Sequence, residues 1–281
     1  MTVHRCPEMR KAEHQDSERE KEQRTKPIHA QTKHDSPLLR EWNIPSIDET
    51  SFSINMTDLH SGTLSVVGTP IGNLADITLR ALETLKTVDF VLAEDTRVTK
   101  KLLMRYEITT PVFSAHEHTD IKKLEGFLDR IEAGENVAVV TDAGTPGLSD
   151  PGNILVSLAL VRGIAVVPIP GVSAVAALVS VAGIDMREFT FLGFPPHKKG
   201  RETYFKRVAA SVLPIMYYES PHRLLKNLEL LQSLSPEKRI IIGRELTKMY
   251  EEIVRGSIAE GIAYFTEHPE KVKGEFTVIV Y

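Results

Sequence analysis

The sequence predicts an α/β protein of two domains, preceded by a polar tail. Residues 62–187 alternate short apolar β-branched runs with amphipathic runs, which is typical of a parallel sheet with crossover helices. Residues 188–281 predict an α+β domain with a mixed or largely antiparallel sheet. Glycine-bearing loops follow three of the N-terminal strands, and this pattern predicts a ligand cleft at the carboxyl edge of the sheet.

The composition excludes several classes of protein. The 281 residues are 42% hydrophobic and 26% charged, which suits two globular domains. Cys6 is the only cysteine, so we expect no disulfide, cysteine metal cluster or thiol nucleophile in the folded part. No run of about 18 apolar residues predicts a membrane span. Because the net charge is −4, any contact with nucleic acid requires a local basic patch.

The tail comprises residues 1–61. Its first forty residues are rich in Lys, Arg, Glu, Gln and His, with scarcely any apolar side chains. Such a composition buries too little surface to offset the entropy of ordering, so we predict a disordered segment.

The first predicted strand is Thr63–Val67, followed by a glycine turn at residues 68–74 and a helix over residues 77–85 with Asp76 as its cap. The spacing of Gly68 and Gly72 departs from the G-x-G-x-x-G fingerprint, and no phosphate-binding Gly-Lys-Ser/Thr follows. Alone, this turn is as consistent with a structural role as with a binding role.

The second predicted strand, Asp89–Ala93, ends in Glu94, Asp95, Thr96 and Arg97. Charged residues at the end of a buried strand indicate a helix cap, a functional site, or both, here before a helix over residues 99–106.

A third extended segment, residues 111–114, precedes His116 and His118. In a continuing strand the two imidazoles would lie on one side, where a metal could bind. Because no third ligand is evident, a loop without metal is favoured. Thr119 or Asp120 then caps a predicted helix that ends at Glu132.

Residues 136–140 predict a buried strand, followed by the twelve-residue loop 141–152 and a helix over residues 153–162. This loop is long for a strand-to-helix connection, which favours a binding role over a plain turn. Another strand at residues 164–167 leads to Gly171 and a helix over residues 175–182. The loops of Gly68, Gly144 and Gly171 are therefore expected to meet at one sheet edge.

In the second half, residues 188–194 predict a strand, and the Pro195-Pro196 pair predicts the hinge between the domains. A basic cluster follows at Lys198, Lys199 and Arg201. It is consistent both with the solvated start of a helix and with a site that contacts phosphate. Further segments are predicted as strands at residues 214–218, 239–243, 249–254 and 276–281, and as a helix at residues 258–265.

Six blocks carry a resemblance to a known family. They are residues 66–74, 93–97, 141–152, 170–174, 218–223 and 244–248. In this order they resemble the bacterial small-subunit ribosomal RNA cytidine 2′-O-methyltransferases, which belong to the tetrapyrrole (corrin/porphyrin) methylase superfamily. The resemblance extends from about Leu64 to Tyr281.

The resemblance implies a cytoplasmic homodimer that has the two-domain tetrapyrrole-methylase fold and binds no membrane. It implies S-adenosylmethionine as co-substrate, bound without a metal in the cleft between the two domains. It also implies the small ribosomal subunit with its 16S RNA as partner. By position, the cofactor-binding residues are Gly68, Pro70, Ile71, Gly72, Asp142, Ala143, Gly144, Gly147, Ser173, Ala174 and Tyr218.

The implied reaction is attack of a cytidine 2′-oxygen on the cofactor's methyl group. Candidates for the base are Asp95, Glu94 and His116, with Glu219 as a further one, while Arg97 would stabilise the alkoxide or grip a phosphate. Candidate phosphate contacts are Lys198, Lys199, Arg201, Arg223 and Arg244. A same-fold methyltransferase acting on a corrinoid or porphyrin, and a non-catalytic module that binds the cofactor or RNA, remain as alternatives.

Overall fold

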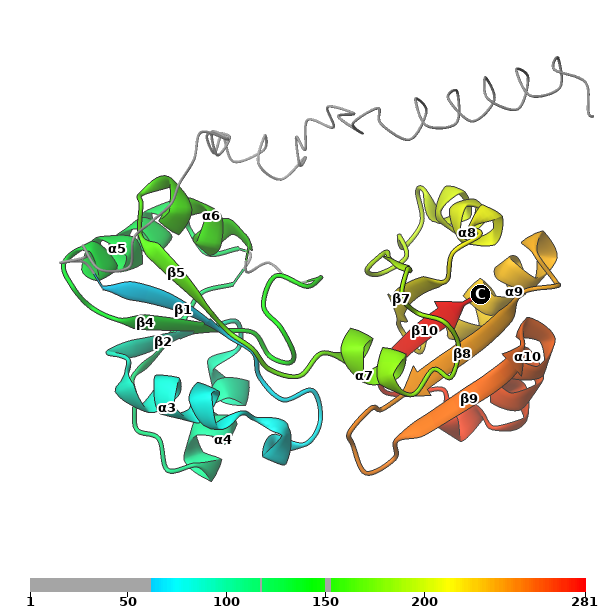
Figure 1. Cartoon of the computed structure of the whole chain (residues 1–281), viewed down its shortest axis with the longest axis horizontal. Helices are drawn as coiled ribbons and strands as arrows, with labels where there is room; N and C mark the ends of the chain where they lie inside the picture. The colour runs from blue at the N-terminus through cyan, green and yellow to red at the C-terminus, as the bar shows by residue number, and fades with distance from the viewer. Residues whose placement is uncertain (1–61, 117, 150–152) are drawn as a thin grey trace, which may run out of the picture. The chain divides into compact units, whose positions relative to one another are not determined.

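Two five-stranded sheets organise the chain in a computed structural model that describes residues 62–116, 118–149 and 153–281 (Figure 1). The predicted disordered tail lies outside these residues. The elements run in the order β1 (Thr63–Val67), η1 (Leu74–Asp76), α3 (Leu79–Thr87), β2 (Phe90–Ala93), α4 (Thr96–Arg105), β3 (Val112–Ser114), α5 (Ile121–Glu132), β4 (Val137–Val140), α6 (Asn153–Val161), β5 (Ala165–Ile169), α7 (Ala174–Ser180), β6 (Thr190–Phe191), α8 (Arg201–Ala210), β7 (Ile215–Glu219), α9 (Leu224–Leu234), β8 (Arg239–Arg244), β9 (Glu252–Ser257), α10 (Ile258–Glu267), η2 (Pro269–Lys271) and β10 (Phe276–Val280).

The first sheet has the order β3-β2-β4-β1-β5, and every pairing in it is parallel. Alternate residues of its buried strands face opposite sides, as the two-residue period of a strand requires. Leu92 and Val139 pack with α5 and α6 in one cluster, while Val91 and Ala138 pack with α3 and α4 in another. We call this sheet and its four helices the first lobe, and it confirms the predicted parallel α/β architecture (Figure 1).

The second sheet has the order β6-β7-β10-β8-β9 and is mixed. β6 pairs with β7 in parallel, and the other three pairings are antiparallel. One face packs against α8, α9 and α10 around Phe205, Leu228 and Phe265. The opposite face contacts α7 through Met216 and Ile279. This sheet with helices α7 to α10 is the second lobe, and its mixed pairing confirms the predicted sheet type.

A shared hydrophobic cluster joins the lobes. Ile71, from the loop after β1, packs in the same cluster as Leu178 of α7, Met216 of β7 and Leu246 after β8. A glycine lies beside this contact: a Cβ on Gly72 would lie 2.3 Å from the Lys248 Cγ and 2.9 Å from the Leu246 carbonyl oxygen. The first-lobe loop therefore approaches the second lobe closely at a position where a larger residue does not fit.

Several local predictions are wrong. Asp76 does not cap α3, because the turn η1 occupies residues 74–76 and the Thr78 hydroxyl accepts the Ala81 N–H instead. Pro195-Pro196 is not the hinge, since β6 already pairs with β7 in the second sheet. The strand predicted at residues 249–254 begins at Glu252, because Glu245 and Thr247 adopt positive φ angles of 50° and 63° and form a turn before it.

In the part of the chain that the structure describes, no helix is both long and apolar enough to cross a bilayer.

Candidate functional site

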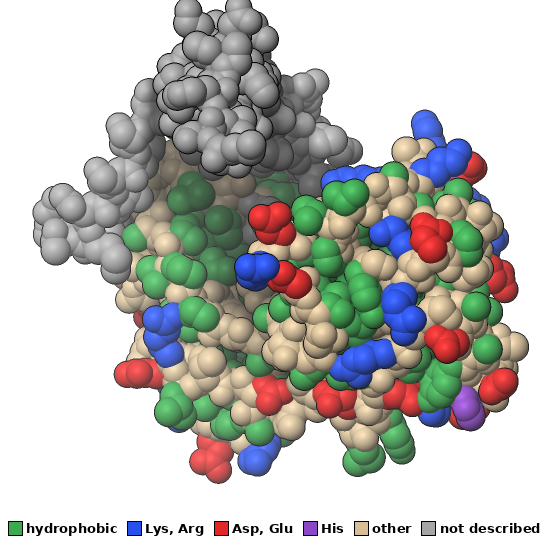
Figure 2. Space-filling model, turned by 45° about the vertical axis from the view of Figure 1, so that its right-hand side comes forward, with side chains coloured by type: hydrophobic (Ala, Val, Ile, Leu, Met, Phe, Trp, Pro, Cys, Tyr) green, Lys and Arg blue, Asp and Glu red, His purple; other side chains and the backbone are tan. Residues whose placement is uncertain are grey.

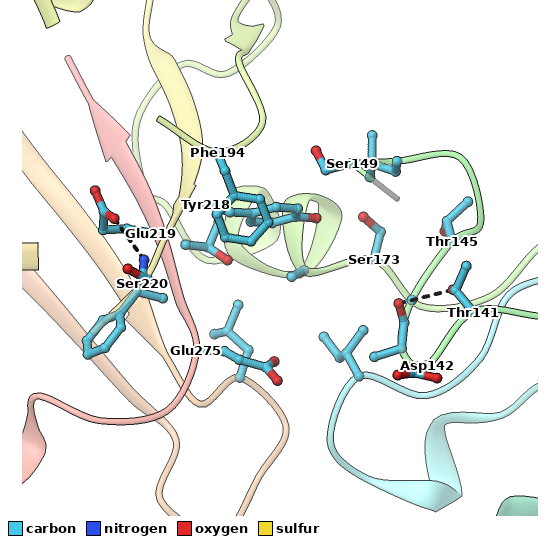
Figure 3. Close-up of a pocket in the computed structure, with 18 of the residues that line it drawn as sticks. Thr141, Asp142, Thr145, Ser149, Ser173, Phe194, Tyr218, Glu219, Ser220 and Glu275 are labelled. Carbon is cyan, nitrogen blue, oxygen red and sulfur yellow. Dashed lines mark hydrogen bonds between the residues drawn. The ribbon is translucent and has the colours of Figure 1, made fainter. Parts of the chain in front are cut away.

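A pocket of about 450 Å³ lies between the two lobes, at the carboxyl ends of β1, β2, β4 and β5 (Figure 3). This volume falls in the range of about 300–1,000 Å³ that is typical of small-molecule sites. Its lining residues are Ile71, Glu94, Thr141, Asp142, Ala143, Gly144, Thr145, Leu148, Ser149, Ser173, Ala174, Phe194, Tyr218, Glu219, Ser220, Pro221, Leu246, Gly274, Glu275, Phe276 and Thr277.

Three loops of the first lobe are joined to one another at the pocket. Thr69 and Gly144 exchange backbone hydrogen bonds of 2.9 and 3.0 Å, and the Thr69 hydroxyl donates to the Thr141 carbonyl at 3.2 Å. The Thr145 hydroxyl donates to the Val172 carbonyl at 3.4 Å. The strands β4, β1 and β5 are neighbours in the sheet, so the loops that follow them meet at the pocket.

Gly68 and Gly171 make the closest of these approaches. A Cβ on Gly68 would lie 2.7 Å from the Gly171 backbone nitrogen, and one on Gly171 would lie 2.8 Å from the Gly68 carbonyl. Both distances are too short for real Cβ contacts, and the obstructing atoms are backbone. The two glycines therefore set the spacing between the first and third loops.

The described lining contains four acidic side chains and no Lys, Arg or His. Asp142 comes from the first lobe and Glu275 from the second, and they lie on opposite sides of the pocket in Figure 3. Glu94 and Glu219 are the other two. Apolar walls lower the local dielectric and strengthen the field of the carboxylates that face the pocket. Such a site favours a ligand that carries positive charge.

Most of the predicted cofactor residues are brought together here. Those that line the pocket are Ile71, Asp142, Ala143, Gly144, Ser173, Ala174 and Tyr218, while Gly68, Pro70, Gly72 and Gly147 lie outside the lining. Gly68 and Gly72 instead occupy the close approaches described above. Gly147 has a positive φ of 87°, which suits a turn in the loop after β4.

Of the predicted catalytic residues, Glu94 lines the pocket and Asp95 does not. Asp95 caps α4, where its Oδ1 accepts the Arg97 backbone N–H at 2.8 Å and its Oδ2 accepts the Arg97 Nη2 at 2.6 Å. The hydrogen bond from the Arg97 side chain, with those from its backbone, lowers the pKa of Asp95 to about 2. Asp95 also donates its backbone N–H to the Asp142 Oδ1 at 3.0 Å, so it positions a pocket residue.

His116 and His118 lie outside the lining, and both are exposed. The Nδ1 of His116 accepts the His118 backbone N–H at 3.2 Å, an arrangement of a local turn. Within residues 62–116, 118–149 and 153–281, no group of three or more His, Cys, Asp or Glu side chains is placed to hold a metal ion.

Glu219 lies in the pocket wall but is only 2% exposed. Its carboxyl group points away from the pocket in Figure 3, accepts the Asn227 Nδ2 at 2.6 Å and accepts the Ser220 N–H at 2.8 Å. Burial raises the pKa of Glu219, against the opposing effects of Asn227, Ser220 and Arg223. This geometry fixes the turn from β7 to α9 and gives no access to a ligand, which argues against Glu219 as a base.

Two of the predicted phosphate contacts, Arg223 and Arg244, instead form hydrogen bonds with backbone carbonyls inside the second lobe. Arg244 is 5% exposed and donates to the carbonyls of Lys271, Lys273 and Tyr250. The side chain of Arg223 is 13% exposed and donates to the Pro195 carbonyl at 2.7 Å. Both predictions are wrong, because these guanidinium groups are already satisfied inside the second lobe. Lys198 and Lys199 are exposed, and Arg201 is half-buried.

Sequence reasoning missed several lining residues, above all Phe194 and Glu275 from the second lobe. Glu275 is ion-paired with Lys248 at 3.2 Å, and its backbone N–H donates to the Glu245 Oε1 at 2.9 Å. A weak signal was present for Phe194, since it stands between Gly193 and a double proline. No local pattern marks Glu275, because its place in the pocket depends on the pairing of β10 with β7 and β8.

Comparisons with known proteins agree with this architecture. The chain matches the family model of Tetrapyrrole (Corrin/Porphyrin) Methylases over residues 63–261. A Borrelia garinii protein named Ribosomal RNA small subunit methyltransferase I is 49% identical over 222 residues, covering 77% of this chain and 97% of that protein. A protein of the same name from Escherichia coli O157:H7 is 43% identical over 225 residues, covering 79% of each chain.

Solved structures show the same fold at low sequence identity. A diphthine synthase is 13% identical with a TM-score of 0.62, covering 78% of this chain and 89% of that chain. A uroporphyrin-III-C-methyltransferase from Thermus thermophilus is 17% identical with a TM-score of 0.56, covering 78% and 94%. With the parallel first sheet, the mixed second sheet and the pocket between them, these matches place the chain in the tetrapyrrole (corrin/porphyrin) methylase family.

Proposed function

We propose that this protein transfers a methyl group from S-adenosylmethionine to the ribose 2′-oxygen of a cytidine in 16S ribosomal RNA. The observation that carries the proposal is the acidic lining of the pocket between the lobes, which contains Glu94, Asp142 and Glu275 besides the buried Glu219 and has no cationic side chain among its described residues. A sulfonium donor with an ammonium group matches that charge. The RNA substrate is supported by the names of the relatives, which are 43–49% identical to this chain.

The pocket residues fit the chemical groups of this donor. Backbone N–H groups of the glycine loop around Gly144 suit the carboxylate of its methionine part. The Asp142 carboxylate can accept hydrogen bonds from the ammonium group or the ribose hydroxyls. Ile71, Ala174 and Tyr218 offer apolar and aromatic surface to the adenine. We therefore assign these residues to cofactor binding, with Gly68 and Gly72 shaping the loops around them.

When bound, S-adenosylmethionine supplies a methyl group that its sulfonium charge already activates for in-line displacement. The protein then has to position the 2′-hydroxyl, exclude water and accept the proton. Among the predicted bases, we assign the last role to Glu94, which follows β2 and lines the pocket. Because the methyl group is activated without a Lewis acid, the proposed reaction uses no metal.

Replacing Asp95 with Asn and Glu94 with Gln distinguishes the residue that caps α4 from the residue that accepts the proton. We expect Asp95→Asn to keep wild-type turnover, because Asn retains the capping oxygen and a carboxylate with a pKa of about 2 is a poor base. We expect Glu94→Gln to lower kcat by about 100-fold or more, the usual effect of removing a general base. Steady-state kinetics at neutral pH tests both. Loss of turnover in Asp95→Asn, with Glu94→Gln unaffected, would reverse the assignment.

We further propose that the enzyme is a cytoplasmic homodimer, as the resemblance to its family implies. The proposed function is tested by mapping 2′-O-methyl groups on 16S ribosomal RNA from cells with and without the protein, and by labelled methyl transfer in vitro. We expect one cytidine mark to disappear and to return on incubation with the purified protein. Label found in a corrinoid or porphyrin instead, or binding without turnover, would support one of the two alternatives.

A further inference from the structure

The ring of Phe194 is an apolar surface at the rim of the pocket. It is 52% exposed, although it lines the pocket and belongs to a segment that leads directly from β6. Singly exposed hydrophobic side chains are common on protein surfaces. Phe194 differs from the more exposed Met249 and Tyr250 in that its ring also lines the pocket. A ring at such a position is available to stack against a planar group.

Phe194 is the outer member of a row of three aromatic rings. Phe191 is half-buried and packs against the hydrophobic cluster of Leu178 and Met216, and its ring centroid lies 4.9 Å from that of Tyr218. The Phe194 ring lies 5.2 Å from Tyr218 on an interplanar angle of 52° (Figure 3). Phe191 and Tyr218 are half-buried and Phe194 is exposed, so Phe194 is the outermost ring of the row.

The backbone at Phe194 is held in place. Gly193 has a φ of 62°, and its carbonyl accepts the Tyr218 N–H at 3.0 Å. A Cβ on Gly193 would lie 3.0 Å from the Ser149 Oγ, so the second lobe approaches the long loop of the first lobe at this point. A ring on a backbone fixed in this way loses little conformational freedom on binding.

Exposed cations follow the ring in the sequence. Lys198 and Lys199 are exposed, and among the described residues neither ammonium group forms a hydrogen bond or an ion pair. By contrast, Lys206 on the same segment pairs with Glu202 at 2.7 Å. On the face shown in Figure 2, Lys and Arg side chains are mixed with Asp and Glu. A phosphate-binding site on this surface must therefore be local.

We propose that Phe194 is a stacking platform for one base of single-stranded RNA, and that Lys198 and Lys199 contact its flanking phosphates. Aromatic rings beside a basic track are the usual means of binding an unpaired strand, since every base has a π-face. The inference rests on the proposed function, because it places RNA at the same pocket. The adenine of the cofactor is the other flat group that an aromatic ring of this pocket can contact. Because Tyr218 is less exposed than Phe194, we assign the contact with adenine to Tyr218.

Substitution of Phe194 tests whether its ring stacks on a base of the RNA. The substrate is the small ribosomal subunit from cells that lack this protein, and the donor is labelled S-adenosylmethionine. We expect Phe194→Leu to lower kcat/KM for the subunit by about 5-fold to 150-fold, the change that corresponds to about 1–3 kcal/mol for one stacked base. Phe194→Tyr should retain wild-type kcat/KM, because it restores an aromatic ring. Tyr250→Leu is the matched control, since Tyr250 is 66% exposed and lies outside the lining.

Binding of S-adenosylmethionine to the same variants, measured by calorimetry, identifies the occupant of the ring. Unchanged cofactor affinity with reduced kcat/KM for the subunit supports the inference. An equal loss of cofactor affinity in Phe194→Leu would assign the ring to the adenine and overturn it, as would wild-type values for both quantities. If the wild-type protein itself transfers no methyl group to the subunit, the proposed function fails rather than the assignment of Phe194.

The salt dependence of subunit recognition tests the two lysines. Each phosphate contact with a single strand contributes about 0.7 to the slope of log affinity against log salt. We expect Lys198→Ala with Lys199→Ala to reduce that slope by about 1.4. The adjacent exposed pair Lys100 and Lys101 on α4 gives a matched control as a double alanine variant. An unchanged slope in the first variant, or an equal reduction in the second, would contradict a local phosphate contact.

Discussion

Replacing Asp142 with Asn is expected to weaken binding of S-adenosylmethionine by about 10-fold to 100-fold, the usual effect of losing a charged hydrogen bond. The change removes one negative charge from a pocket whose described lining has no cationic side chain. It keeps the volume of the side chain and an oxygen that can accept the Asp95 N–H, which lies 3.0 Å from Oδ1. The loss therefore reports the charge rather than the shape of the loop. Calorimetry with the purified protein measures it.

Asp185→Asn is the matched control for Asp142. Asp185 is an exposed carboxylate paired with Arg187 at 2.6 Å, and it lies outside the pocket lining. We expect this variant to bind the cofactor as the wild type does. Wild-type affinity in Asp142→Asn would show that the acidic wall does not recognise the sulfonium donor, and the main support for the proposed co-substrate would be lost.

Replacing Gly68 with Ala is expected to destabilise the protein by about 1–3 kcal/mol and to abolish cofactor binding. The added Cβ would lie 2.7 Å from the Gly171 nitrogen, and neither backbone can move without shifting a loop at the pocket. The loop of Gly68 also holds Thr69, which bonds to Gly144. A displacement here therefore reaches two binding loops at once. Denaturant unfolding and calorimetry measure the two effects.

Gly126→Ala is the matched control, because the same substitution is expected to stabilise the protein at this position. Gly126 lies inside α5, and a Cβ there would meet nothing within 4 Å. Because Ala is favoured over Gly in a helix interior, we expect this variant to gain about 0.5–1 kcal/mol. Equal behaviour of the two variants would contradict the steric role of Gly68 in setting the spacing of the loops.

The sequence alone predicted the strands of the first lobe and the loops after them. Thr63–Val67 is a strand as predicted, since three of its five residues are β-branched and a glycine turn follows it. The resemblance in six blocks was also sufficient to identify the family. These features depend on neighbouring residues or on the order of motifs along the chain, so they can be predicted without knowing the tertiary contacts.

The caps and the basic residues show where local patterns became ambiguous. Asp76 and Thr78 are both good capping residues, and the intervening turn η1 decided between them. Arg223 and Arg244 look like surface cations in the sequence, yet the second sheet and its neighbouring turns enclose both. Whether a residue is buried depends on which elements pack over it, and the distribution of charges along the sequence does not predict that packing.

What the sequence determined by itself was the family, the order of the elements and the glycine loops that bring backbone to a ligand. Only the tertiary structure decided which side chains face the pocket. Glu275 and Phe194 reach it through strand pairings between distant segments, while Asp95 turns to cap α4 and Glu219 turns into the second lobe. The reason is physical: a side chain's direction is set by the packing and hydrogen bonds around it, and most of those partners are far away in the sequence.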